Sequence, residues 1–348
     1  MRVCIPVESL NEGGGYYFIR LLWEYLDRNG VPWTNRLSDD YDVLFASGWL
    51  VAFENVRAAK MRLSRLRVVH RVDGSARDYG RFDSADVIQA RVNLLADATI
   101  FQSDYGRYAT REKFRVVLQD GPVIRNPVDT KLFRSDGESA DIPGEMRVLN
   151  ASWSTNRQKG TWQIPILAER HPGVTFVLCG RYPDLPDLPN VRHLGHLDSP
   201  ALARAMRGCD VFLDLTENEC CSNVTLQAMA SGLPVIHKGS GGTPELVGEA
   251  GAVMRSDLSD FRPVLNDVLR RRDRLSALAL ERVRACFAPD VVFPRYMNVL
   301  DGASRRPLPT LGTYLGAVLR GCPLTVYPFW QYPFRRSWRL VVGDRERR

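Results

Sequence analysis

Apolar and polar positions alternate along this chain as short apolar runs, each followed by an amphipathic segment. In the first half, runs of strand length occupy residues 2–7, 42–47, 67–72, 98–103 and 122–127, with helical patterns at 16–28, 52–66 and 83–95. The second half repeats the alternation, with strands expected at 146–152, 174–180, 191–196, 210–215 and 234–238 and helices at 162–170 and 200–207. Strands that alternate with helices predict parallel sheets covered by helices on both faces.

A break in this pattern separates the two halves. Residues 135–145 are acidic and polar and are interrupted by glycine and proline, which is typical of a linker. We therefore expect a first α/β domain over 1–140 and a second over 141–286. Ligands of open α/β sheets bind beyond the carboxyl ends of the strands, so two such domains facing one another predict a ligand cleft.

The composition is that of a globular protein with room for two cores, since 45% of the 348 residues are hydrophobic and 25% are charged. No apolar run is long enough to cross a bilayer, and the first residues fit a strand better than a signal peptide. The seven cysteines are scattered, and the adjacent pair Cys220-Cys221 matches no zinc spacing. We expect reduced thiols and a cytoplasmic protein.

Residues 214–249 carry the most informative chemistry. Ser222 or Asn223 can cap a short helix that Gly232 ends. A strand and the turn GSGG follow, and we expect Thr243 to cap the next helix, with a proline at its first position. The free N–H groups and positive dipole ends of both helices would converge, which favours an anion at that spot.

This stretch resembles the retaining glycosyltransferases of family four, which have the two-domain GT-B fold. The resemblance rests on Glu219, seven intervening residues, QAMA at 227–230, GLPVI at 232–236 and GG-x-x-E at 241–245. In that family the first of two glutamates touches the transferred sugar, and the second holds the donor ribose. Here the second is Gln227, whose neutral amide can still bond a ribose diol at a loss of about 1 kcal/mol.

The resemblance also implies which residues surround the donor, a nucleoside-diphosphate sugar. It places His196 and Leu197 beside the nucleobase, although a hydrogen-bonded strand-end histidine is an equal alternative. The other donor-binding residues that it implies are Asn223, Val224, Thr225, Gly241, Gly242 and Glu245.

Gly13 and Gly14 follow the first strand and precede a helix. Glycines at such a turn let the backbone approach a phosphate, and the resemblance places this pair beside the donor phosphates. The local alternative is a flexible turn. The run does not read G-x-G-x-x-G, so a dinucleotide site is not supported.

A leaving diphosphate develops negative charge, which fixed cations must neutralise where no metal serves. Family members use an arginine and a lysine with four residues between them, the lysine followed by glycine. Lys159 and Gly160 match the lysine, whereas Ser154 stands at the arginine position. Arg157 can supply the missing charge from the same loop, although a solvated surface pair is the alternative. The resemblance thus implies no metal and no cofactor beyond the nucleotide-sugar.

Asp40 and Asp42 have the D-x-D spacing of metal-dependent transferases. They precede a strand rather than follow one, so we interpret them as surface acids. On the acceptor side, Asp73 is the catalytic candidate, at the end of a first-domain strand. Arg71 and Asp73 alternate onto one face there and His70 onto the other, and a mutual Arg71–Asp73 salt bridge is the alternative interpretation.

The chain end differs from the rest. The family resemblance implies a helix over 287–304 that crosses back to the N-terminal domain. The segment 305–348 mixes aromatics with arginines, and the net charge is +7 with a pI of about 9.1. These features fit an anionic membrane surface. A tail that packs on the body of the protein or on a second copy is an equal alternative. We expect no nucleic-acid partner, because no recognised nucleic-acid module accompanies these residues.

The combined prediction is a metal-independent glycosyltransferase that moves a hexosyl or related sugar to a hydroxyl with retention of configuration. The acceptor would be a glycan, glycolipid or other glycoconjugate, and the protein would be cytoplasmic or peripheral at a membrane. Two alternatives stay open: a catalytically inert sugar-nucleotide-binding partner subunit, motivated by Gln227 and Ser154, and a sugar-nucleotide epimerase. The expected catalytic residues are Glu219, Lys159, Arg157 and Asp73.

Overall fold

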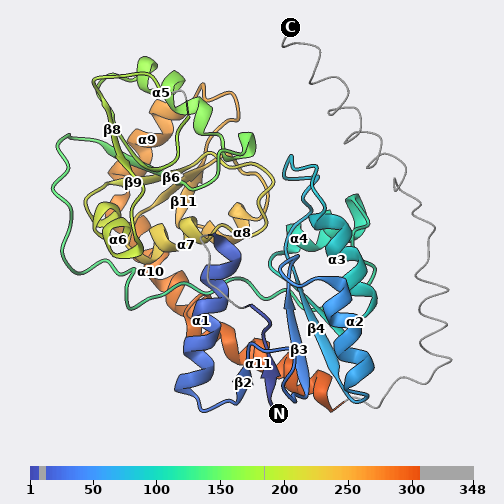
Figure 1. The fold of residues 1–348 in the computed structure, drawn as a ribbon. Helices are drawn as coiled ribbons and strands as arrows, with labels where there is room; N and C mark the ends of the chain where they lie inside the picture. The colour runs from blue at the N-terminus through green and yellow to red at the C-terminus, as the bar shows by residue number, and fades with distance from the viewer. Residues whose placement is uncertain (8–12, 184, 306–348) are drawn as a thin grey trace, which may run out of the picture. The chain divides into compact units, whose positions relative to one another are not determined.

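The computed structural model describes residues 1–7, 13–183 and 185–305, whose elements are labelled in Figure 1. These residues form two parallel sheets, one in each half of the chain. The first sheet has the strand order β2-β1-β3-β4-β5, and the second has the order β11-β10-β9-β6-β7-β8. All strand pairs within the described residues are parallel. The expectation of two helix-covered parallel sheets is confirmed.

The first sheet is formed by β1 (Val3–Cys4), β2 (Trp33–Thr34), β3 (Val43–Ser47), β4 (Arg67–Val72) and β5 (Ala98–Phe101). Its helices are α1 (Gly14–Arg28), α2 (Phe53–Arg62), α3 (Ala85–Leu94), α4 (Asp104–Tyr108) and the π-helical turn η1 (Ala109–Lys113). Neighbouring side chains of a strand point to opposite faces. Val43 and Phe45 therefore pack with α1, whereas Leu44 and Ala46 pack with α2 and α3.

The second sheet is formed by β6 (Arg147–Ser152), β7 (Thr175–Gly180), β8 (Val191–Gly195), β9 (Val211–Asp214), β10 (Val235–His237) and β11 (Gly251–Val253). Two short 3-10 turns, η2 (Arg157–Lys159) and η3 (Thr161–Gln163), precede its first α-helix. The α-helices are α5 (Ile164–Arg170), α6 (Ser199–Arg207), α7 (Asn223–Ala230), α8 (Thr243–Val247), α9 (Phe261–Arg270) and α10 (Arg272–Cys286).

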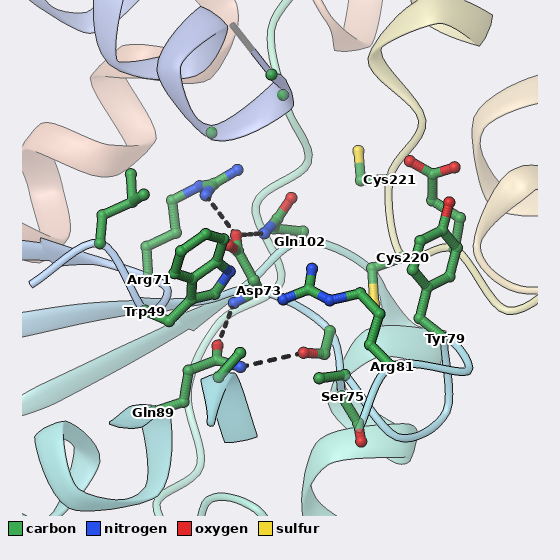
Figure 2. A pocket seen from close by; sticks show the side chains of 18 of the residues that line it. Trp49, Arg71, Asp73, Ser75, Tyr79, Arg81, Gln89, Gln102, Cys220 and Cys221 are labelled. Atoms are coloured by element: carbon green, nitrogen blue, oxygen red, sulfur yellow. Dashed lines mark hydrogen bonds and ion pairs between the residues drawn. The ribbon is translucent and has the colours of Figure 1, made fainter. Parts of the chain in front are cut away.

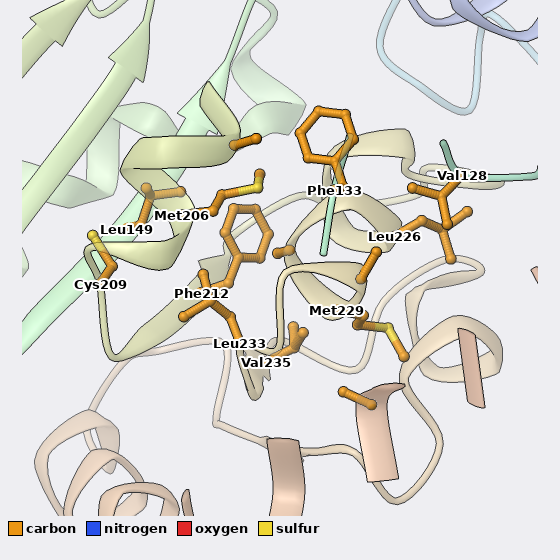
Figure 3. Close-up of a cluster of buried hydrophobic side chains, with 14 of the residues drawn as sticks. Val128, Phe133, Leu149, Met206, Cys209, Phe212, Leu226, Met229, Leu233 and Val235 are labelled. Carbon is orange, nitrogen blue, oxygen red and sulfur yellow. The ribbon is translucent and has the colours of Figure 1, made fainter. Parts of the chain in front are cut away.

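Figure 3 shows the apolar cluster on one face of the second sheet. Phe212 of β9 is buried there with Met206 of α6 and Met229 of α7. Val128 and Phe133 are buried in the same cluster, so the chain joins the second domain's core before the acidic segment at 135–145. Burying side chains of this size contributes about 1.5–3 kcal/mol each.

The last described helix, α11 (Pro289–Ser304), packs on the first sheet. Phe293, Tyr296 and Leu300 are buried in the cluster that contains α1 and β3. The ring centroids of Phe18 and Tyr296 lie 5.2 Å apart. The chain therefore returns from the second half to complete the core of the first.

Two local expectations were wrong. Residues 122–127 do not form a strand, because only Val123 makes an isolated bridge, to Phe101, and the flanking prolines have no N–H to donate. Thr243 is not the N-cap of α8. Gly242 holds that position, and the Thr243 hydroxyl donates to Asp214 instead.

None of the helices in the described ranges combines the length and hydropathy needed to cross a bilayer. Nearly all of the aromatic and basic segment at 305–348 lies outside the described residues. Its membrane or self-association role therefore stays a prediction.

His70 is the buried titratable group of β4 on the face opposite Arg71. Its Nε2 lies 3.1 Å from the carbonyl oxygen of Gly48, and its Nδ1 lies 3.2 Å from the side-chain amide of Asn93. Burial lowers the pKa of His70 to about 4, although the Gly48 carbonyl and the Asp73 carboxylate oppose the shift. The folded protein thus holds a neutral imidazole at neutral pH.

This imidazole predicts a loss of stability at acid pH. An unfolded histidine titrates near pH 6.5, so the unfolded chain binds the extra proton as the pH falls from 6.5 towards 4, and the free energy of unfolding should fall by up to about 3 kcal/mol from this group. Urea denaturation of wild type and His70→Gln at several pH values measures it. The variant should have the flatter pH dependence, and equal slopes would contradict the assignment.

Candidate functional site

A cavity of about 350 Å³ lies among loops of both halves of the chain, and Figure 2 shows side chains that line it. This volume falls in the range of roughly 300–1,000 Å³ that is typical of small-molecule sites. The second half contributes the loop that follows β9. The first half contributes the start of α1 and the loops that follow β3, β4 and β5. The residues from the predicted set that line the cavity are Gly13, Gly14, Asp73, Glu219 and Asn223.

Glu219 forms the central ion pair of this cavity. Its Oε2 accepts a hydrogen bond from Lys159 Nζ at 2.6 Å. Gly241 lies in the loop between β10 and α8 and has a φ of 64°. A Cβ there would lie 2.4 Å from the carbonyl oxygen of Glu219. Gly241 and Gly242 therefore let the glycine loop pack directly on the backbone that carries Glu219.

Lys159 is held as a cation. Burial on its own would lower the pKa of Lys159, but the Glu219 carboxylate and the Tyr79 hydroxyl outweigh burial and keep that pKa above its usual value. Its Nζ also lies 5.6 Å from the centroid of the Tyr79 ring. Tyr79 lines the cavity, so the lysine is enclosed by two side chains of the cavity wall.

The N-termini of α1 and α7 meet at the cavity. Ser222 caps α7 by accepting a hydrogen bond from the backbone of Thr225. The Asn223 side chain donates to the carbonyl oxygen of Gly14 at 3.0 Å and accepts from Asn126 at 2.8 Å. Gly14 has no room for a side chain, because a Cβ there would lie 2.9 Å from Asn223 Nδ2. Two positive helix ends from different halves of the chain thus face the same space.

A buried carboxylate links α7 to α8. Asp214 Oδ2 accepts hydrogen bonds from the hydroxyls of Thr225 at 2.8 Å and Thr243 at 3.2 Å. Both threonine hydroxyls thereby donate their hydrogen bonds to Asp214. The start of α8 is thus tied to the end of β9 rather than turned to the cavity.

The first-half wall of the cavity is organised by Arg71. Its guanidinium donates to Asp73 Oδ1 at 3.1 Å and to Asn126 Oδ1 at 2.6 Å. Gln102 donates to the same Asp73 oxygen at 2.6 Å, and the backbone N–H of Asp73 donates to Gln89. The salt bridge that the strand alternation allowed is present, and it fixes one carboxylate oxygen of Asp73.

Glu245 binds the first half of the chain. Its carboxylate accepts hydrogen bonds from the backbone N–H groups of Asp104 and Tyr105 and from the side chain of Arg125 at 2.7 Å. Cys220 also packs against the first half of the chain. Its sulfur lies so close to Gly74 that a Cβ on Gly74 would be 2.2 Å away. These contacts connect loops of the second half to the start of α4 and to the residues that follow β4.

The remaining predicted residues lie outside the cavity lining. Arg157 is exposed, and its guanidinium lies 4.5 Å from the Trp162 ring centroid. The ring of His196 contacts that of Trp153 at a tilt of 57°, with 3.9 Å between ring centroids. Gln227 is buried and hydrogen-bonds to the hydroxyl of Tyr17. Ser154, Leu197 and Val224 pack locally within the second half.

Beyond Gly13, Gly14 and Asp73, sequence reasoning missed most of the cavity residues that the first half contributes, chiefly Trp49, Tyr79, Arg81, Gln89 and Gln102. A signal existed for two of them. Trp49 follows the carboxyl end of β3 and Gln102 follows that of β5, which is where ligands of parallel sheets collect. Among the described residues, no group of three or more His, Cys, Asp and Glu side chains is arranged to hold a metal ion.

Residues 161–270 match the family model of the glycosyl transferases group 1. Among solved structures, sucrose-phosphate synthase from Thermosynechococcus elongatus is similar with a TM-score of 0.69 and 16% identity, covering 86% of this chain and 98% of that chain. HepE of Anabaena, solved in complex with UDP and glucose, gives a TM-score of 0.67 at 15% identity, with coverage of 86% and 99%.

A glycosyltransferase from Rickettsia africae gives a TM-score of 0.64 at 10% identity, covering 88% of this chain and 99% of that chain. No curated protein sequence matches this chain significantly. At such identities the likeness establishes the fold, which is the GT-B fold expected from the sequence.

Gly48 provides a test of the cavity wall. It has a φ of 53°, and a Cβ there would lie 2.2 Å from Asp73 Oδ2. Gly48→Ala should therefore displace Asp73 and cost about 1–3 kcal/mol of unfolding free energy beyond the cost of the backbone conformation. Gly30→Ala is the matched control, because Gly30 has a φ of 62° and nothing within 4 Å of the added Cβ. Equal losses for the two variants in urea denaturation would show that the contact with Asp73 does not matter.

Proposed function

We propose that this protein is a glycosyltransferase that moves a sugar from a nucleoside-diphosphate sugar to a hydroxyl acceptor, with retention of configuration. The observation that carries the proposal is the Lys159–Glu219 pair at the cavity, where the N-termini of α1 and α7 also meet. The match of residues 161–270 to glycosyl transferases group 1 supports it, since both Glu219 and Asn223 lie in the matched segment.

The ion pair is the part of the site that a donor must rearrange. Lys159 is charged and enclosed, and in this structure its charge is balanced by Glu219. A diphosphate that enters beside Gly13 and Gly14 offers Lys159 a second anionic partner. Glu219 is then released to accept hydrogen bonds from hydroxyls of the sugar. The pair thereby couples diphosphate binding to sugar binding.

The transfer needs no protein side chain as a base, because the leaving phosphate takes the proton of the acceptor hydroxyl. The bond between the anomeric carbon and the diphosphate oxygen breaks, and its electron pair leaves with the diphosphate. The acceptor oxygen forms the new bond on the same face of the sugar, and the proton of the acceptor hydroxyl passes to the leaving phosphate oxygen. Lys159 and the helix N-termini stabilise the charge that develops on the diphosphate. These fixed charges support a metal-independent reaction.

The other donor contacts follow from the same placement. Gln227 would hold the ribose, and Asn223, Val224 and Thr225 would present the start of α7. His196 and Leu197 would lie beside the base, where the contacting rings of Trp153 and His196 offer an aromatic surface. UDP-sugars are the first donors to test, because HepE of Anabaena was solved with UDP and with UDP-glucose.

Glu219→Gln tests the proposal with a matched control on the same loop. Glu217 pairs with Lys238 as Glu219 pairs with Lys159, but Glu217 does not line the cavity. Release of UDP from a panel of UDP-sugars should fall on the order of 100-fold in Glu219→Gln, because the sugar loses its charged partner. Glu217→Gln should retain the wild-type rate. Equal rates for wild type and Glu219→Gln would contradict the assignment.

The same panel separates the alternatives. Saturable UDP-sugar binding without turnover would indicate an inert binding subunit, and a stereochemical change without UDP release would indicate an epimerase.

Gln227→Glu should preserve or raise donor affinity. The Tyr17 hydroxyl beside position 227 can donate to the new carboxylate, and a charged acceptor binds a ribose diol about fivefold more tightly than an amide. The KM for the donor measures this. A KM that rose on the order of tenfold would remove Gln227 from the ribose site.

A further inference from the structure

The cavity has more wall than the donor contacts account for. All donor residues except Gly13 and Gly14 come from the second half of the chain, whereas most lining residues come from the first. Trp49, Asp73, Arg81 and Gln102 are among the latter. Resting on the proposed function, we infer that this wall is the acceptor subsite and that it selects an acidic saccharide, a sugar that carries a carboxylate or a phosphate.

Trp49 supplies an aromatic surface to the wall. The side chain lines the cavity and is 40% exposed, so part of the indole face is open to a ligand there. Its position is fixed by Gly48, whose N–H donates to the carbonyl oxygen of Arg71 at 2.6 Å. An indole face that is open to the cavity suits the apolar face of a sugar ring.

Arg81 supplies a cation beside that aromatic surface. Its guanidinium lies 5.4 Å from the Trp49 ring centroid, and Figure 2 shows both side chains in the cavity together with Asp73. Arg81 Nε and Nη2 both contact a single oxygen of Asp83. Among the described residues no partner is found for Nη1, so part of the guanidinium fork can bind an anion in the cavity.

The charges of the wall favour an anionic ligand. Arg71 is balanced by Asp73 within the cavity, and Glu219 is balanced by Lys159. Arg81 is different, because its partner Asp83 is half exposed and does not line the cavity. A carboxylate or phosphate on the acceptor would complete the charge balance on the cavity side, which a neutral sugar does not.

Asp73 completes the subsite at the hydroxyl end. Its Oδ1 is occupied by Arg71 and Gln102, whereas no partner is found for Oδ2 among the described residues. Oδ2 can accept a hydrogen bond from an acceptor hydroxyl. The saccharide would then be held at three points by Trp49, Arg81 and Asp73.

Binding of simple saccharides to the full-length protein, in the presence of UDP, tests this inference. The probes are the methyl glycosides of glucose, galactose and mannose, each as the neutral sugar, the 6-carboxylate and the 6-phosphate. Saturation-transfer NMR should show that the acidic forms of at least one sugar bind on the order of 10-fold more tightly than its neutral form. The carboxylate and phosphate arms then identify which anion is preferred.

Arg81→Gln should remove this preference, leaving acidic and neutral forms within about twofold of each other. Arg91→Gln is the matched control, since Arg91 also lies over an aromatic ring and pairs with an acid, but it does not line the cavity. Arg91→Gln should keep the preference. Should Arg81→Gln not fold, the wild-type comparison still decides the outcome.

The inference is overturned by the absence of a preference for any acidic form in the wild type, or by a preference that persists in Arg81→Gln. Weaker UDP binding by Arg81→Gln without any acceptor would also overturn it, by assigning Arg81 to the donor diphosphate. These results are distinct from failure of the proposed function, which the wild type would show by releasing no UDP from any UDP-sugar of the panel.

Discussion

The buried guanidinium of Arg71 is the constraint on which the rest of the structure depends. The side chain is 1% exposed, and a charge without water is costly unless every donor finds a partner. Its partners come from separate parts of the chain, namely Asp73 at the end of β4, Asn126 in the segment after β5 and Tyr296 of α11. Satisfying one charge therefore fixes the returning helix and the cavity wall together.

From Arg71 the hydrogen bonds continue into the second domain. The Asn126 side chain accepts a hydrogen bond from the Arg71 guanidinium and donates one to the side chain of Asn223. Asn223 in turn donates to the carbonyl oxygen of Gly14 at the start of α1. Two balanced ion pairs, Arg71–Asp73 and Lys159–Glu219, stand at the cavity that results, and the N-termini of α1 and α7 face it. A ligand that binds at such a site must separate an ion pair and take the place of one partner. Its affinity therefore depends on how well its own groups replace the interaction that is lost.

Much of the fold and half of the site follow from local sequence. The Ser222 cap, the Gly232 turn and the glycine loop at 241–242 each have a local cause, and Glu219 and Asn223, which belong to this stretch, line one cavity. The first-domain wall could not be read in this way. Trp49 and Arg81 are brought together by a positive φ at Gly48 and by loops that pack across the domains. Glu245 shows the same limit, because its partners Asp104 and Arg125 lie far away in the sequence.

The measurement that tests the central claim most directly is a crystal structure of the protein with a bound UDP-sugar. The account predicts that Lys159 Nζ leaves Glu219 and contacts a phosphate oxygen, with Glu219 against the sugar hydroxyls and the diphosphate facing Gly13 and Gly14. A donor bound elsewhere, or a diphosphate in the cavity with the Lys159–Glu219 pair intact, would contradict it.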